Sequence, residues 1–225
     1  MNRYKQISQF RKPLDLITNW FHYPIATFLC VILSYTFITP NIITVLAISF
    51  ELLAIYLILT NFIEYVFIIV ILLQLGWIFD LMDGMMARFK QLGFYHPTQP
   101  SNKGYYLDAV SDHILKFIII GALGYQLSRN HEFGWEIGML ALIIHGITQT
   151  EHTLRNMINN GLNVSKKNKI SNNFTTHFVL LKNNIYLFYL IFIPINRIDL
   201  LLISFAFFEL LLLFKRMIFF WINES

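Results

Sequence analysis

Long apolar runs separated by polar stretches dominate this sequence. Six of them lie at residues 41–60, 65–79, 105–127, 135–148, 175–195 and 200–221. A helix needs about 20 predominantly apolar residues to cross a lipid bilayer, and the longer runs approach or reach that length. The pattern therefore predicts an all-α integral membrane protein with six transmembrane helices.

A further apolar run, residues 24–38, precedes the six and follows a basic N-terminal stretch. Its 15 residues are short for a membrane span and are typical of a helix that lies along the membrane interface. The tripeptide Thr39-Pro40-Asn41 then predicts a break and a new helix start, with Asn41 as a possible cap. We expect two parts: residues 1–39, with the interfacial helix, and residues 40–225, the six-helix membrane domain.

Polar residues modify two of the runs. The second continues with helical spacing beyond its apolar part, from Asp80 to Lys90. The fifth is interrupted by Lys182, Asn183 and Asn184. Because ionisable residues at membrane depth generally face the bundle interior or a wet cavity, we expect this polar part to line a cavity.

Composition and charge support the membrane interpretation. The 225 residues are 56% hydrophobic and 13% charged, whereas soluble domains average about 45–50% and about 25%. In a six-span arrangement nearly all lysines and arginines of the loops fall on one side, and only Arg129 and Arg197 fall on the other. Positive charge marks the cytoplasmic side, so we expect cytoplasmic termini in a bacterial plasma membrane. This distribution of charge does not indicate a nucleic-acid partner.

Two linked motifs carry the candidate chemistry. In the first, helical spacing places five residues on one stripe: Asp80, Asp83, Gly84, Ala87 and Arg88. In the second, Gly104, Asp108 and Asp112 recur every four residues and share a face. The two helices are consecutive and antiparallel, so the sequence predicts that the stripes face each other near the cytoplasmic boundary.

Four carboxylates at membrane depth would repel one another unless cations lie between them. Oxygen ligands without histidine or cysteine favour Mg²⁺ or Mn²⁺. The small residues Gly84, Ala87 and Gly104 permit close approach of a helix or a ligand, and Arg88 suits a phosphate group.

The pattern D-x-x-D-G-x-x-A-R followed by G-x-x-x-D-x-x-x-D resembles the signature of the CDP-alcohol phosphotransferases, also called CDP-alcohol phosphatidyltransferases. The Pro40-Asn41-Ile-Ile-Thr44 stretch is similar to the entry to that family's first membrane helix, and the six-helix plan agrees as well. One departure is the spacer at residues 89–103, which is longer than usual and rich in loop-forming residues.

The resemblance implies a role for each motif residue. Asp80, Asp83 and Asp108 would hold two divalent ions, and Asp112 would act as the catalytic base and could also contact a metal ion. The CDP moiety would lie against Gly84, Ala87, Arg88 and Gly104. The resemblance further implies a CDP-alcohol donor, with CDP-diacylglycerol favoured, a small hydroxyl acceptor, release of CMP, and a homodimer.

The sequence does not identify the acceptor alcohol. A phosphorylated acceptor would need additional cations, for which Arg155, Lys116 and Lys182 are candidates. Arg155 could equally anchor the end of its helix. Glu51 and Glu209 lie inside apolar runs without a visible partner, so a role in helix packing is the simpler interpretation for both.

Two other functions use similar residues. Membrane prenyltransferases bind magnesium pyrophosphate through aspartates, but on two motifs of distant helices, whereas this chain has one split motif on adjacent helices. A divalent-cation transporter could use the same carboxylates, although such sites usually lie near the membrane midplane between internal repeats. Neither arrangement is visible in this sequence.

Overall fold

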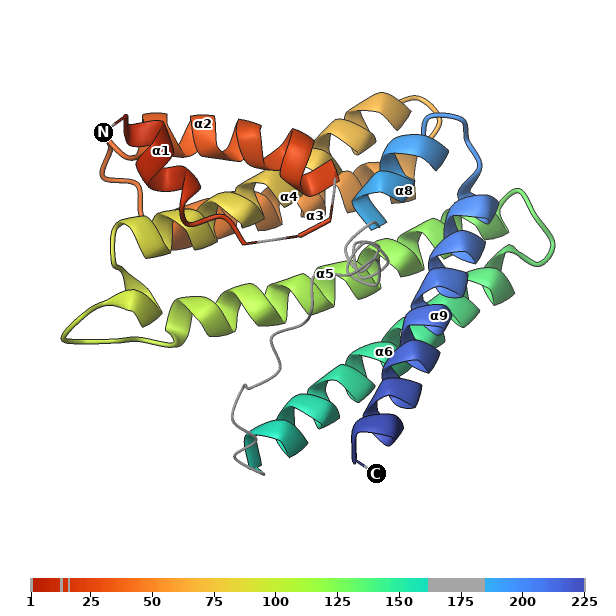
Figure 1. Cartoon of the computed structure of the whole chain (residues 1–225). Coiled ribbons are helices and arrows are strands. Elements are labelled where there is room, and N and C mark those ends of the chain that lie inside the picture. The colour runs from red at the N-terminus through yellow and green to blue at the C-terminus, as the bar shows by residue number, and fades with distance from the viewer. Residues whose placement is uncertain (1, 13, 16, 162–184, 225) are drawn as a thin grey trace.

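The computed structural model describes residues 2–12, 14–15, 17–161 and 185–224, which form helices joined by loops and include no strand (Figure 1). The described helices are α1 (Arg3–Ser8), the π-helix η1 (Thr18–His22), α2 (Tyr23–Leu33), α3 (Pro40–Asn61), α4 (Val66–Phe89), the 3₁₀-helix η2 (Gly93–Tyr95), α5 (Lys103–Ser128), α6 (Gly134–Gly161), α8 (Ile185–Phe192) and α9 (Ile198–Glu224). The predicted all-α class is confirmed.

Most predicted helices correspond to a helix of the structure. The continuation of the second run is confirmed, because α4 extends through the aspartate motif to Phe89. The helix α6 reaches Gly161, well beyond the predicted end at residue 148. Of the fifth run, residues 185–192 form α8, whereas residues 175–184, with Lys182, lie outside the described residues.

Among the described helices, Pro40–Asn61 and Val66–Tyr95 are long and apolar enough to cross a membrane. The helices α5, α6 and α9 are also long, at 26, 28 and 27 residues, but carry more polar side chains. The structure thus supports a membrane-embedded helical protein, and the full count of six spans remains a prediction.

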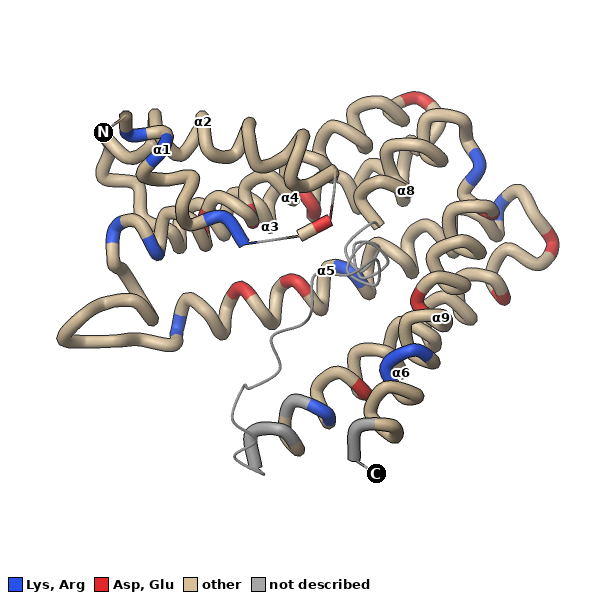
Figure 2. Tube along the Cα trace, in the orientation of Figure 1, with Lys and Arg blue, Asp and Glu red and all other residues tan. Residues whose placement is uncertain are grey.

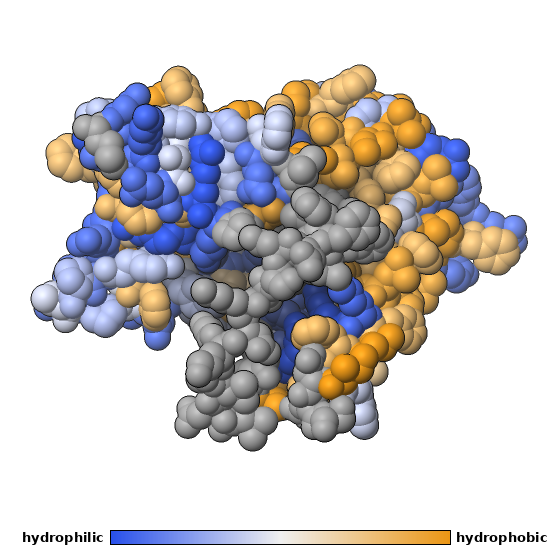
Figure 3. Space-filling model, in the orientation of Figure 1, coloured by the Kyte–Doolittle hydropathy of each residue, from blue (hydrophilic) through white to orange (hydrophobic). Residues whose placement is uncertain are grey.

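The surface of α3 explains why this helix suits a lipid environment. Its inner face buries Ile43, Ala54 and Ile58, while Val45 and Leu53, on other faces, are about half exposed. A helix that is apolar on all sides is typical of a membrane span. In Figure 3 hydrophobic side chains gather over α8 and α9, and hydrophilic side chains lie at the left and right ends of the view.

The core of the fold is a layer of three long helices, α3, α4 and α5. α3 packs against both α4 and α5, α2 lies along α4, and α6 packs against α5 and α9 (Figure 1). The helices α5 and α6 approach closely at Gly124 and Gly138, where a β-carbon on Gly124 would lie 2.8 Å from the Gly138 Cα. Small residues therefore set the spacing of this hairpin, as is common between membrane helices.

The apolar run at residues 24–38 forms a helix of different extent, and its position along the membrane interface stays a prediction. It is α2, which ends at Leu33 rather than at residue 38. The following helix begins at Pro40 with Thr39 at the N-cap position, so the expected capping role of Asn41 was wrong. The connection between the two helices is tied to the end of α4, since Lys90 Nζ donates hydrogen bonds to the carbonyl oxygens of Thr36 and Ile38.

Candidate active site

Three aspartates from the two predicted motifs converge between α4 and α5. One carboxylate oxygen each from Asp80, Asp83 and Asp108 lies within 4.8 Å of the others. Asp83 is buried, and the other two are partly buried. Figure 2 shows the acidic positions of α5 on the part of this helix that lies below α3 and α4 in the view. The helical spacing of the two motifs thus brings three of the four expected carboxylates into one group.

The helix α3 completes the cluster from a third side. The Thr44 hydroxyl donates a hydrogen bond of 2.5 Å to Oδ2 of Asp83. A cavity of about 10 Å³ lies between α3, α4 and α5, roughly the space of one water molecule. It is lined by Thr44, Ala47, Ile48, Glu51, Asp80, Asp108, Ser111, Asp112 and Leu115.

Asp112 lines this cavity but is not a member of the group of three. Its Oδ2 instead accepts a hydrogen bond of 2.9 Å from Lys116 Nζ, one turn further along α5. Both side chains are partly exposed, at 33% for Asp112 and 18% for Lys116. Three of the carboxylates therefore lie close enough to share an ion, and the fourth lines the same cavity and is paired with a lysine.

The three clustered carboxylates fit divalent cations. Magnesium and manganese prefer oxygen ligands, and Mg²⁺ is commonly held by a few carboxylates together with phosphate oxygens and water. The oxygens of Asp80, Asp83 and Asp108 are close enough to share such ions, and the Thr44 hydroxyl orients one of the carboxylates. Without cations, three carboxylates at this distance would repel one another strongly.

Arg88 lies beside this group at the end of α4. A β-carbon on Gly84 would be 3.4 Å from Arg88 Nη2, so the guanidinium lies back over Gly84. Its Nε donates a hydrogen bond of 3.1 Å to the carbonyl oxygen of Phe10, and the Tyr95 ring lies 5.9 Å from its Cζ. Ala87 is partly buried on the next turn. The small residue Gly84 thus gives room to an arginine of the same helix.

Gly104 permits a close contact between two helices. A β-carbon at this position would lie 2.8 Å from Oδ1 of Asn41 at the start of α3. The absence of a side chain therefore lets the first turn of α5 lie against the first turn of α3. This contact joins the Pro40–Thr44 stretch to the second aspartate motif.

Glu51 is a residue whose position the sequence did not reveal. It is buried on α3, lines the same cavity, and its Oε1 accepts a hydrogen bond of 3.0 Å from the Tyr186 hydroxyl on α8. Gly76 of α4 makes room for it, because a β-carbon there would be 2.6 Å from Glu51 Cγ. Its spacing of seven residues from Thr44 was the available signal, since this places both on one face of α3.

The second buried glutamate also has a partner. Oε1 of Glu209 on α9 lies 3.5 Å from Nδ1 of His145 on α6. The rings of Phe117 and Phe205 lie 5.2 and 5.5 Å from the imidazole. This pair lies in the contact between α6 and α9, which agrees with the packing role expected for Glu209.

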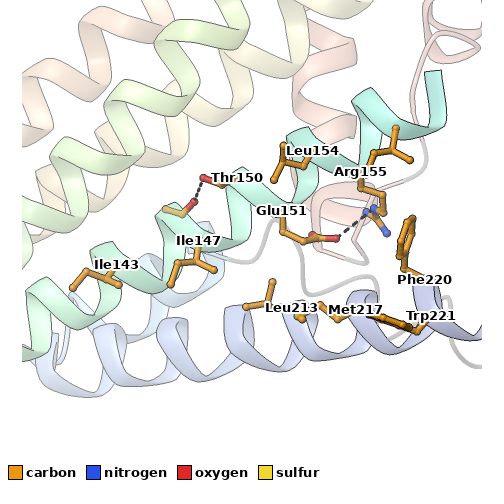
Figure 4. A pocket seen from close by; sticks show the side chains of 12 residues that line it. Ile143, Ile147, Thr150, Glu151, Leu154, Arg155, Leu213, Met217, Phe220 and Trp221 are labelled. Carbon is orange, nitrogen blue, oxygen red and sulfur yellow. Dashed lines mark hydrogen bonds and ion pairs between the residues drawn. The ribbon is translucent and has the colours of Figure 1, made fainter. Parts of the chain in front are cut away.

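Arg155 lies in a separate groove between α6 and α9, with a volume of about 710 Å³ (Figure 4). Its Nε is 3.6 Å from Oε1 of Glu151, whose other oxygen is 3.4 Å from Arg216 Nη1. Figure 4 shows Glu151 and Arg155 among the apolar residues that line the groove, including Leu154 and Trp221. The structure therefore does not place Arg155 among the residues that line the aspartate cavity, whereas Lys116 contacts Asp112 directly.

The site and the fold define a helical membrane protein with a carboxylate cluster suited to divalent cations. The sequence model of the CDP-alcohol phosphatidyltransferase family matches residues 37–223, and the chain belongs to this family. Its members are membrane-embedded transferases that transfer phospho-alcohol groups in phospholipid synthesis, use CDP-alcohol donors and alcohol acceptors, and typically use divalent metal ions. None of the curated proteins matches the chain with significant similarity.

Proposed function

We propose that this protein transfers a phosphatidyl group from CDP-diacylglycerol to the hydroxyl group of a small alcohol and releases CMP. The observation that carries the proposal is the convergence of the four motif aspartates around one small cavity, with different partners. Asp80, Asp83 and Asp108 form a group suited to metal ions, while Asp112 lines the same cavity and is held by Lys116. A group that binds phosphates and a separate base are the two parts that such a transfer needs.

In the proposed reaction, Asp112 accepts the proton of the acceptor hydroxyl. The acceptor oxygen then forms a bond to the donor phosphorus that lies farther from cytidine. The bond between that phosphorus and the oxygen bridging the two phosphates breaks, and CMP leaves with the electron pair. Proton removal by a positioned carboxylate typically contributes about 10²–10⁴-fold to such a rate.

Other residues bind and orient the donor in this proposal. Asp80, Asp83 and Asp108 would hold two ions of Mg²⁺ or Mn²⁺, which neutralise developing charge and align an in-line displacement. The CDP moiety lies against Gly84, Ala87 and Gly104, and Arg88 binds a phosphate oxygen. Thr44 supports the arrangement, since its hydroxyl fixes the orientation of the Asp83 carboxylate.

The proposed cellular setting follows from charge and family. Both termini and the site face the cytoplasm of a bacterial cell, because the basic residues of a six-span arrangement collect on that side. The membrane domain extends over residues 40–225, and two copies associate as a homodimer. The basic positions around α1 and the adjoining end of α4 support this orientation (Figure 2).

The test is CMP release by the purified protein in detergent. CDP-diacylglycerol would be supplied with Mg²⁺ or Mn²⁺ and a panel of acceptors: glycerol phosphate, inositol phosphate, serine and amino alcohols. We expect CMP that depends on one acceptor, disappears with a chelator, and falls at least about 100-fold in Asp112→Asn.

Two other outcomes would redirect the assignment. CMP release only with a CDP-linked small alcohol would change the donor and leave the reaction class unchanged. Movement of divalent cations across proteoliposome membranes without CMP formation from any donor would identify a transporter and refute the proposed transfer.

A further inference from the structure

A short N-terminal segment, residues 10–12, lies against the end of α4 that carries Arg88. The carbonyl oxygen of Phe10 accepts the hydrogen bond from Arg88 Nε, and the Phe10 ring packs edge-to-face on Phe89 at 6.3 Å. The two hydrogen-bonded residues are 78 positions apart in the sequence. The orientation of the guanidinium therefore depends on the backbone of a segment outside both aspartate motifs.

The Arg11 side chain anchors this segment to two neighbouring helices. Its Nε donates a hydrogen bond of 2.9 Å to the Thr27 hydroxyl on α2, and its Nη2 donates one of 2.7 Å to the Tyr4 hydroxyl on α1. Thr27 is itself buried on α2, which packs along α4. Arg11 thus connects the segment to two helices and limits where the Phe10 carbonyl can lie.

Lys12 belongs to the same segment, two residues after Phe10, whose carbonyl oxygen contacts Arg88. Its backbone N–H donates a hydrogen bond of 3.0 Å to the Tyr23 hydroxyl, while its side chain is exposed. Burial raises the pKa of Tyr23, so this hydroxyl is neutral at ordinary pH. Lys12 is therefore an exposed cation in the segment whose backbone holds Arg88.

A cation in this place is suited to phosphate. Because Lys12 lies in the segment that holds Arg88, a phosphate group bound by Arg88 would bring negative charge close to it. Lysine on a flexible stem binds phosphate as a point charge, whereas arginine binds it with a planar fork. Lys12 and Arg88 would then contact one phosphate-bearing ligand from two directions.

We propose that residues 10–12 form an outer wall of the donor site, with Lys12 binding the diphosphate of a cytidine diphosphate group. In the same wall the Phe10 carbonyl, held by Arg11, positions Arg88 for those phosphates. This inference rests on the proposed function and adds to it a binding residue, Lys12, and a positioning residue, Arg11. Both lie outside the stretch that the family model matches.

The first test compares Lys12→Gln with Lys5→Gln, which removes an exposed lysine from α1 in the same basic N-terminal region. Binding of CDP and of CMP to the purified full-length protein in Mg²⁺ would be measured by calorimetry. We expect Lys12→Gln to weaken CDP binding about tenfold, the usual size of one hydrogen bond to a charged group. CMP, which lacks the second phosphate, should be affected less, and Lys5→Gln should bind both as the unaltered protein does.

The second test addresses the positioning role of Arg11. Arg11→Gln and Thr27→Val remove the same hydrogen bond from its two ends, so one variant suffices if the other fails to fold. We expect both to raise the KM for the donor several-fold while the KM for the acceptor is unchanged. A purely structural role would instead reduce thermal stability and kcat and leave the donor KM unchanged, and that result would overturn the assignment of Arg11.

The outcomes separate this inference from the proposed reaction. If Lys12→Gln binds CDP as well as Lys5→Gln does, the proposed binding of the diphosphate by Lys12 is refuted. This holds even if the unaltered protein releases CMP. If CDP binding depends on Lys12 but no donor gives CMP, the diphosphate site is supported and the transfer reaction is refuted. Failure of the unaltered protein to bind CDP would overturn both.

Discussion

The hydroxyl of Thr44 on α3 donates a hydrogen bond to the carboxylate of Asp83 on α4, and both side chains are buried. The carbonyl oxygen of Pro40 is also within reach of this hydroxyl at 3.2 Å, but the hydroxyl has one proton and the carboxylate is closer. A neutral donor beside a carboxylate that binds metal fixes its orientation without adding a competing positive charge. Partners of this kind commonly change metal affinity when they are removed.

Replacing Thr44 with valine should therefore weaken metal activation. We expect Thr44→Val to raise the Mg²⁺ concentration for half-maximal CMP release by about tenfold or more, since loss of such a partner typically costs 10–100-fold. Thr60→Val is the matched control, because the Thr60 hydroxyl bonds only the Tyr56 carbonyl among its described contacts on the same helix. Equal Mg²⁺ dependence in the two variants would contradict the role assigned to Thr44.

Lys116 should act through Asp112 rather than bind the acceptor. Its Nζ lies 2.9 Å from Asp112 Oδ2, so Lys116→Gln is expected to lower kcat about tenfold by releasing the proposed base from its position. The KM for the acceptor should change little. Steady-state kinetics at varied acceptor concentration would measure both, with Arg129→Gln at the other end of α5 as the control. A raised acceptor KM with unchanged kcat would assign Lys116 to acceptor binding instead.

The hydrogen bond between Tyr186 and Glu51 should contribute to stability. Tyr186→Phe leaves a buried carboxyl oxygen without this donor, so we expect the free energy of unfolding to fall by about 1–3 kcal/mol. Tyr189→Phe is a close control on the same helix, because among the described residues the buried Tyr189 hydroxyl has no hydrogen-bond partner. Its removal should change stability by less than about 0.5 kcal/mol. Unfolding in mixed detergent would compare them, and equal losses would contradict this account.

The contact between Gly124 and Gly138 should not tolerate a side chain. A methyl group on Gly124 would meet backbone atoms of α6, so Gly124→Ala is expected to destabilise the protein by about 1–3 kcal/mol. Gly121→Ala, one turn earlier on α5, places its methyl group 3.8 Å from Leu142 Cδ1, which is an ordinary contact. Both changes bring the same gain in helix propensity. Thermal unfolding in detergent should therefore show a lower melting temperature only for Gly124→Ala, and a stable Gly124→Ala protein would refute the close approach.

The sequence by itself determined the helical class, the family and the meeting of the two aspartate motifs. Helical periodicity fixes which side chains share a face, so Asp80 and Asp83 on one helix and Asp108 on the next could be placed without coordinates. Asp108 meets the other two because consecutive antiparallel helices bring their adjacent ends together. The family match over residues 37–223 confirms the resemblance drawn from these same motifs.

Only the tertiary structure decided which distant residues surround this group. Periodicity specifies the face that Glu51 occupies but not that Tyr186, 135 residues away, would lie opposite it. It likewise could not reveal that the carbonyl of Phe10 would hold Arg88, or that Arg155 would lie with Glu151 in a groove between α6 and α9. Such contacts depend on how helices far apart in the chain rotate and cross, and packing of the whole molecule determines those angles.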